Sequence, residues 1–101
     1  MKRLFLDDIR QPPGDGWHVV RSHDEFVRWV MKNGVPDEVS FDHDLGDTSD
    51  PERTGYDSAK WLGRHCVENQ IPLPAWRVHS ANPVGRENIE HAMRSAARHV
   101  D

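Results

Sequence analysis

Short apolar segments alternate with longer amphipathic segments along this chain, and that order restricts its fold more than any other feature. Four segments have the character of strands and three have apolar residues at helical spacing, in the order strand, loop, strand, helix, strand, helix, strand, helix. Connections of helix length favour parallel strands. We therefore predict an α/β fold with a small, mostly parallel four-stranded sheet, and the length of 101 residues predicts a single domain over 1–101.

Turn and capping residues predict where these elements begin and end. Strands are expected at 3–7, 17–20, 38–42 and 75–79. Each helix should begin just after a capping residue, which is Ser22, Thr54 or Asn82. The first connection, 8–16, contains two prolines and two glycines and has no helical pattern. It is close to the shortest chain that joins parallel strands, so a hairpin between the first two strands stays open as an alternative.

The composition argues against several classes of protein. Acidic residues outnumber lysine and arginine by 17 to 13, and the formal net charge of -4 argues against an extended nucleic-acid surface or an anionic membrane as partner. No apolar run approaches the roughly 20 residues that cross a bilayer, and acid follows the first residues too early for a signal peptide, so we expect a cytoplasmic protein. The one cysteine, Cys66, falls on the apolar side of a predicted helix and is expected to be a buried thiol.

Acidic and polar side chains follow the ends of three predicted strands. They are Asp7 and Asp8 after the first strand, Asp42, His43 and Asp44 after the third, and His79 and Ser80 after the fourth. The carboxyl ends of parallel strands lie along one edge of a sheet, and ligands bind beyond that edge. Carboxylates crowded there repel one another unless a cation joins them. Oxygen ligands favour Mg²⁺, and the two histidines make Mn²⁺ an alternative.

Other acids and histidines have a simpler explanation without a ligand. Acidic residues around the start of the second helix are typical of turns and caps, and these are Asp47, Asp50, Glu52 and Asp57. For Asp44 the two explanations stay open. Five histidines outside the strand ends are expected at the surface, namely His18, His23, His65, His91 and His99.

The order of these motifs resembles a response-regulator receiver domain. The residues that carry this resemblance are Asp7-Asp8, Asp42, Gly55-Tyr56-Asp57 and Ser80-Ala81. The resemblance implies strand order 2-1-3-4, Mg²⁺ held by the paired acids, a phosphoryl group accepted by Asp42, and contact of Ser80 with that group. Two features depart from receivers: a proline-rich loop replaces the helix between the first two strands, and the sequence ends before a fifth strand, its lysine and the last helix. These departures argue against ordinary phosphorelay signalling.

Four longer blocks resemble a narrower group, the cyclic-phosphate processing receiver domains. The blocks are LFLDDIRQPP, FDHDLG, TGYD and VHSANPVGRENI, and together they span most of the chain. This resemblance implies a receiver-like sheet with about three helices, and a phosphate-containing small molecule or nucleotide as the ligand.

We therefore expect a pocket that binds a divalent metal and opens a cyclic phosphate by hydrolysis. The expected metal ligands are Asp7, Asp8, Asp42 and Asp44. The expected catalytic residues are Asp42, His43 and His79, and the expected phosphate-binding residues are Arg10, Ser80, Asn82 and Arg86. The alternative is a non-catalytic module that binds Mg²⁺ and a phosphate, or accepts a phosphoryl group on Asp42, and acts through a protein partner. Three helices would cover one face of the sheet, and the uncovered face would be free for a second copy or another protein.

Overall fold

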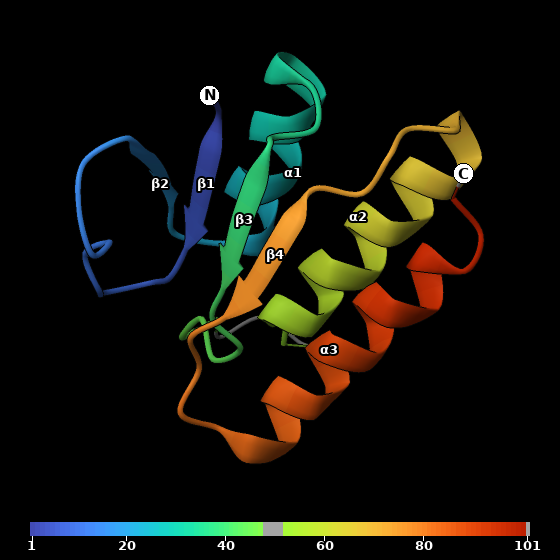
Figure 1. The fold of residues 1–101 in the computed structure, drawn as a ribbon. Helices are drawn as coiled ribbons and strands as arrows, with labels where there is room; N and C mark the ends of the chain where they lie inside the picture. The colour runs from blue at the N-terminus through green and yellow to red at the C-terminus, as the bar shows by residue number, and fades with distance from the viewer. Residues whose placement is uncertain (48–51, 101) are drawn as a thin grey trace.

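The four strands form one sheet, and the three helices lie on one side of it (Figure 1). The structure is a computed structural model that describes residues 1–47 and 52–100. Its strands are β1 (Arg3–Leu6), β2 (Trp17–Val20), β3 (Glu38–Phe41) and β4 (Ala75–Val78). Its helices are α1 (His23–Asn33), α2 (Gly55–Asn69) and α3 (Pro83–Ala97). The predicted α/β fold class is confirmed, and each element lies within two residues of its predicted position.

All neighbouring strands are parallel, in the predicted order β2-β1-β3-β4. The hairpin alternative for the first connection is therefore wrong. The ends of the strands are aligned, because Leu6 pairs with Val20 and with Phe41, and Phe41 pairs with Val78. Residues one position further along each strand therefore lie at the same level of the sheet, along its carboxyl edge.

Each helix begins where its capping residue predicts. The side-chain oxygens of Ser22, Thr54 and Asn82 each accept a backbone N–H from the first turn of the following helix, at 3.1–3.2 Å. Asp57 completes the cap of α2, since its carboxylate accepts the Thr54 backbone N–H at 2.7 Å. These contacts satisfy N–H groups that have no partner within the helix. Among the described residues, no helix combines the length and the apolar character needed to cross a bilayer.

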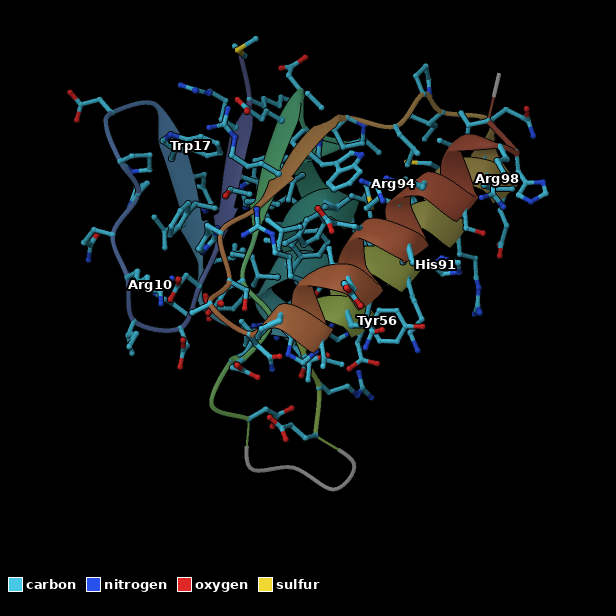
Figure 2. The ribbon with its side chains drawn as sticks, turned by 60° about the horizontal axis from the view of Figure 1, so that its bottom comes forward. Arg10, Trp17, Tyr56, His91, Arg94 and Arg98 are labelled. Atoms are coloured by element: carbon cyan, nitrogen blue, oxygen red, sulfur yellow. The ribbon has the colours of Figure 1, made fainter. Side chains whose placement is uncertain are left out.

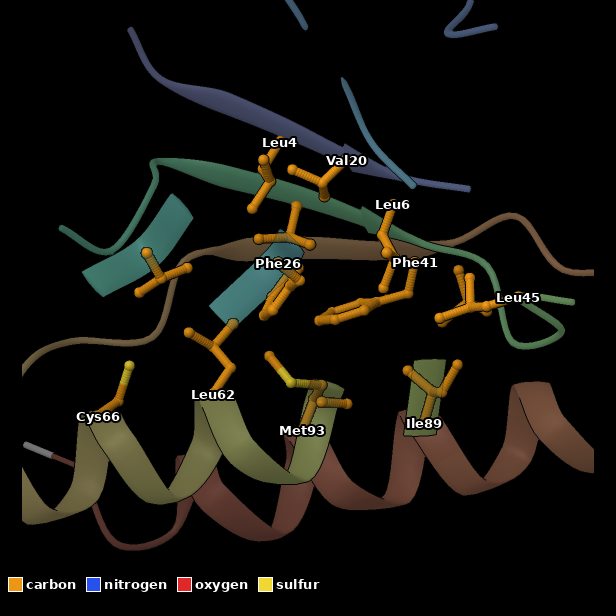
Figure 3. Close-up of a cluster of buried hydrophobic side chains, with 14 residues drawn as sticks. Leu4, Leu6, Val20, Phe26, Phe41, Leu45, Leu62, Cys66, Ile89 and Met93 are labelled. Atoms are coloured by element: carbon orange, nitrogen blue, oxygen red, sulfur yellow. The ribbon is translucent and has the colours of Figure 1, made fainter. Parts of the chain in front are cut away.

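The hydrophobic core lies between the sheet and the helices (Figure 3). Leu4 and Leu6 of β1 and Phe41 of β3 are completely buried on this face. The helices contribute Phe26 and Val30 from α1, Leu62 and Cys66 from α2, and Ile89 and Met93 from α3. Cys66 is buried, as predicted, and burial raises the pKa of its thiol. This packing fixes the sheet and therefore the positions of the residues at its edge.

The other face of the sheet carries charged and aromatic side chains. No helix formed by the described residues covers this face. Glu38 accepts hydrogen bonds from Arg3 Nε, at 3.1 Å, and from Arg77 Nη2. The Arg3 guanidinium lies over the ring of Trp17, 4.4 Å from its centroid. Phe5 is only 3% exposed although it lies on this face, and Trp17 packs edge-on against it with ring centroids 6.0 Å apart. A second copy or another protein on this uncovered face stays a prediction.

Candidate metal and phosphate site

The residues that follow β1, β3 and β4 meet at the carboxyl edge of the sheet. Asp7, Asp42 and His79 each lie one position beyond the aligned strand ends. One potential ligand atom from each residue lies within 4.8 Å of those of the other two. Asp7 is completely buried, Asp42 is 7% exposed, and the side chain of His79 is 20% exposed. The fold thus brings three of the expected site residues into one group.

The carboxylate of Asp7 is held by three groups. Oδ1 accepts the backbone N–H groups of Ile9 and Arg10, both at 2.9 Å, and Oδ2 lies 2.9 Å from His79 Nε2. Burial raises the pKa of Asp7, but the two backbone N–H groups and His79 outweigh burial and bring it below its ordinary value. Asp7 is therefore ionised at neutral pH and places a buried negative charge in the site.

Both ring nitrogens of His79 have partners. Nδ1 lies 2.7 Å from Ser40 Oγ, and Nε2 lies 2.9 Å from Asp7 Oδ2. The ring also stacks on Phe5, with centroids 4.5 Å apart and planes within 6° of parallel. The sequence motifs point to His79 but not to Ser40 or Phe5. A serine inside the otherwise apolar end of β3 is the one signal that could have indicated a buried polar contact. Together these contacts hold the His79 ring in one orientation.

Asp42 is less well compensated than Asp7. Its Oδ1 accepts the His43 backbone N–H at 2.9 Å, while Oδ2 has no hydrogen-bond donor among the residues that the structure describes. Burial, with repulsion from Asp7, raises the pKa of Asp42. The start of α2 packs closely on this residue, since a Cβ at Gly55 would overlap the Asp42 carbonyl oxygen. The two acids are therefore close, buried and mutually repulsive, as expected for ligands of a cation.

His43 connects the site to the first turn of α3. Its Nδ1 lies 3.0 Å from Asp44 Oδ1, and the Asn82 side-chain amide lies 3.4 Å from Asp44 Oδ2. The ring packs directly on Gly85, where a Cβ would overlap it. The Asp44 carboxylate can hold a proton on Nδ1, and the neutral ring then has Nε2 available as an acceptor.

Arg10 reaches the site from the loop that joins β1 to β2, on the side away from α2 and α3 (Figure 2). Its Nη1 donates to the His79 carbonyl oxygen at 3.1 Å, and its Nε lies 4.0 Å from Asp7 Oδ2. Arg21, which follows β2, donates from Nη1 to the carbonyl oxygens of Asp7 and Arg10, at 3.1 and 2.7 Å. No motif indicates Arg21, because its role depends on the path of this loop.

The remaining predicted site residues lie around this group. Asp8 is half-buried with its carboxylate against the loop after β3, and the Asp44 side chain is 64% exposed. Neither belongs to the set of described residues whose ligand atoms converge within 4.8 Å. Ser80 is buried and its Oγ accepts the Asn82 backbone N–H at 3.1 Å, while Arg86 is exposed in the first turn of α3. The metal-binding roles of Asp8 and Asp44 thus stay predictions without support from this geometry.

Two expectations about residues outside the site have different outcomes. Asp57 is a capping residue, as expected, and Asp50 lies outside the described residues. Among the five remaining histidines, His18, His91 and His99 are exposed and His65 is half-buried. The prediction of a surface position for His23 is wrong, because the start of α1 packs on α2 and His23 Nδ1 lies 2.9 Å from Ser58 Oγ. Burial, followed by the nearby Arg53, lowers the pKa of His23.

Comparison with known protein families finds a match over most of the chain. The family model of the cyclic-phosphate processing receiver domain matches residues 2–95. The chain belongs to this family. Comparisons with curated proteins and with solved structures found no match. Membership confirms the family that the four sequence blocks indicate, and it connects the receiver-like fold with the processing of cyclic phosphates.

The donor set at the strand ends fits a divalent cation. Two carboxylates and one imidazole come within reach of a shared ion, and Asp42 Oδ2, which accepts no hydrogen bond from the described residues, is available to it. Carboxylate oxygens suit Mg²⁺ and Mn²⁺, whereas imidazole suits transition metals. Asp7, Asp42 and His79 are therefore the residues that could hold such an ion.

Proposed function

We propose that this domain binds a divalent metal and a cyclic phosphate at the carboxyl edge of the sheet and opens the phosphate ring by hydrolysis. One observation carries the proposal: Asp7, Asp42 and His79, delivered by three strands, place ligand atoms within 4.8 Å of one another. The family description supports the choice of a cyclic phosphate as substrate. When bound, the ion would neutralise phosphate charge and lower the pKa of a bound water.

Positive groups on two sides of the acids would hold the phosphate. Arg10 is anchored through its contact with the His79 carbonyl, and its half-exposed side chain makes further N–H groups accessible to phosphate oxygens. The N-terminus of α3 carries the positive end of the helix dipole and packs on His43. Arg86 in the same turn is exposed and adds a positive charge, and Ser80 and Asn82 lie in the segment that joins β4 to α3.

His43 would act as the general base. With Nδ1–H donated to Asp44, the ring accepts a proton from water at Nε2. The water oxygen forms a bond to phosphorus, and one ester P–O bond of the ring breaks. The leaving oxygen takes this proton back from the imidazolium of His43, so that the product is a phosphate monoester with a free hydroxyl.

Purified protein with 2′,3′-cyclic nucleotides and Mg²⁺ or Mn²⁺ should produce monophosphates. Asp42→Asn and His79→Ala should abolish turnover, and His43→Gln should reduce it by about 10²–10⁴-fold, the usual contribution of a general acid or base. Asp15→Asn in the exposed part of the β1–β2 loop is the matched acidic control and should leave turnover unchanged. Absence of turnover by the wild-type protein with every cyclic phosphate and both metals would contradict the hydrolytic proposal.

A non-catalytic binding role is the second candidate, and the hydrogen bonding of the central residues favours it. Both nitrogens of His79 and both oxygens of Asp7 already have protein partners, as in a rigid binding site. The domain would then bind Mg²⁺ and a phosphate, or accept a phosphoryl group on Asp42, and act through a protein partner.

Acetyl phosphate and a beryllofluoride mimic test this second candidate. Intact mass spectrometry should show one added phosphoryl group on the wild-type protein and none on Asp42→Asn. Tight binding of a cyclic nucleotide without product would also support a binding role, whereas formation of monophosphate would contradict it.

A further inference from the structure

We propose that this site selects a divalent transition metal of the Mn²⁺ type over Mg²⁺, and that Ser40 sets this selectivity by positioning His79 as a nitrogen ligand. The inference rests on the metal-binding part of the proposed function and does not require catalysis. It assigns a metal class to the site and a positioning role to a serine that the sequence motifs do not include.

The selectivity follows from the donor types at the site. Asp7 and Asp42 offer carboxylate oxygens, which both Mg²⁺ and Mn²⁺ accept. His79 offers an imidazole nitrogen within 4.8 Å of those oxygens, and imidazole suits transition metals far better than the hard Mg²⁺ ion. The third ligand therefore adds affinity for a transition metal and little for Mg²⁺.

Asp42 gives independent support for a bound cation. Asp42 is only 7% exposed, and its Oδ2 has no hydrogen-bond donor among the described residues. The two carboxylates lie close enough to share one ion, and they repel each other when both are charged. A cation shared with Asp7 would supply the missing partner and remove the repulsion between the two acids.

The Ser40 hydroxyl can either donate a hydrogen bond to His79 Nδ1 or accept one from it, so it can stabilise the ring both with and without a metal. Without a metal, Nε2–H of the neutral ring donates to Asp7, and Nδ1 accepts the Ser40 hydroxyl hydrogen across 2.7 Å. With a metal on Nε2, the single ring proton lies on Nδ1 and the Ser40 oxygen accepts it, so the ring neither gains nor loses a proton. Metal-bound histidines characteristically donate their other ring N–H in this way.

The Phe5 ring keeps the imidazole in place through this change. Its plane lies within 6° of the His79 plane at a centroid distance of 4.5 Å, so the proton can change nitrogen while the ring stays where it is. Ser40 itself is 3% exposed and belongs to the central strand β3. The hydroxyl is therefore fixed on a rigid element, as a support for a metal ligand needs to be.

Calorimetric titration with Mg²⁺ and with Mn²⁺ tests the role of Ser40. We expect the wild-type protein to bind Mn²⁺ more tightly than Mg²⁺, and Ser40→Ala to weaken Mn²⁺ binding by about 10–100-fold with a much smaller effect on Mg²⁺. Ser40→Thr, which keeps the hydroxyl, should restore Mn²⁺ binding, and Ser95→Ala between α2 and α3 is the matched control that should change neither. Equal binding of both metals by the wild type, or equal weakening of both in Ser40→Ala, would overturn the proposal.

Pulsed electron paramagnetic resonance of the Mn²⁺-loaded protein tests the nitrogen ligand directly and needs no variant for its main result. The wild-type spectrum should show modulation from a directly bound nitrogen. His79→Gln should lose this modulation and His43→Gln should keep it, with circular dichroism checking that both variants are folded. Absence of the modulation in the wild type, or its loss only in His43→Gln, would overturn the assignment.

These results separate the inference from the proposed function. Nitrogen coordination in a protein without turnover supports the metal assignment and contradicts hydrolysis. Turnover with equal use of both metals and no nitrogen coordination supports hydrolysis and contradicts the metal assignment.

Discussion

The two faces of the sheet are built from different chemistry. The face covered by helices buries Leu4, Leu6 and Phe41 completely in an apolar core. The uncovered face places Phe5 beside the polar pair of Ser40 and His79. Packing stabilises the first face, and directed hydrogen bonds and ring contacts organise the second.

This difference shows how one short strand can serve both stability and the site. Successive residues of a strand point to opposite faces, so Ser40 of β3 lies between two core residues, Val39 and Phe41, that are each 0% exposed. The core residues fix the backbone, and the backbone fixes the hydroxyl that contacts His79. The apolar face therefore provides the rigidity that the polar face uses.

Truncating one apolar residue on each face should show the largest difference. Leu4→Ala removes a completely buried side chain from the covered face and should lower the free energy of unfolding by about 2–5 kcal/mol. Val19→Ala on the uncovered face removes a half-buried side chain and should cost about 1 kcal/mol or less. Urea unfolding measures both, and equal losses would show that the two faces contribute equally to stability.

Gly55 lies where the core meets the site, against the backbone of Asp42. Alanine is the better helix former by about 1 kcal/mol, yet a Cβ at Gly55 would overlap the Asp42 carbonyl, so Gly55→Ala should destabilise by about 1–3 kcal/mol. Metal binding should weaken in the same variant, because Asp42 must shift. Gly14→Ala in the β1–β2 loop has no atom within 4 Å of the new Cβ and should change stability by about 0.5 kcal/mol or less. Stabilisation by Gly55→Ala would contradict the close contact.

The covered side should also respond to mild acid through His23. Burial, and then Arg53, lowers the pKa of this histidine from its ordinary value of 6.5, so the unfolded state binds more protons between the two values. Stability is therefore complete above pH 6.5 and falls as the pH drops below it. His23→Gln should flatten this dependence in thermal melts, while His99→Gln at an exposed position should leave it unchanged. An unchanged profile in His23→Gln would assign the effect to another group.

The uncovered face should respond only in stronger acid and by the smallest amount. Burial raises the pKa of Glu38, but the hydrogen bonds of Arg3 and Arg77 outweigh burial and lower it below its ordinary value of 4.5. Its contribution is therefore present above pH 4.5 and is lost as the pH falls through the lowered pKa. Arg77→Ala should cost about 1 kcal/mol or less, because this guanidinium is 58% exposed. Urea unfolding in high salt should reduce that cost, and a cost independent of salt would contradict an exposed ion pair.

Local sequence signals predict the framework of this fold well. The strand pattern and the caps at Ser22, Thr54 and Asn82 depend on neighbouring residues, so they can be recognised without a structure. The meeting of Asp7 and Asp42 follows from parallel strand order alone. The capping signals are local, whereas the meeting of the two acids needs only the strand order in addition.

Contacts between distant segments account for what the sequence does not reveal. The pairing of Ser40 with His79 joins residues 39 positions apart, and its orientation depends on which face each side chain takes. The burial of His23 depends on how α1 packs against Ser58 of α2, which no local pattern encodes. Asp7 and Asp8 are adjacent, yet only Asp7 lies in the central group, because strand alternation turns their side chains in different directions.

Arg21 connects the edge strand β2 to the proposed ligand site. Strand β2 is an edge strand that pairs only with β1, so a local opening there breaks backbone hydrogen bonds to one neighbouring strand rather than to two. Arg21 follows β2 and donates to the carbonyl oxygens of Asp7 and Arg10, so such an opening also releases Arg10, the arginine proposed to bind the phosphate. If a phosphate binds at Arg10 as proposed, fraying of this strand and loss of the anion are one linked equilibrium, and occupancy of the site should slow amide hydrogen exchange in β2.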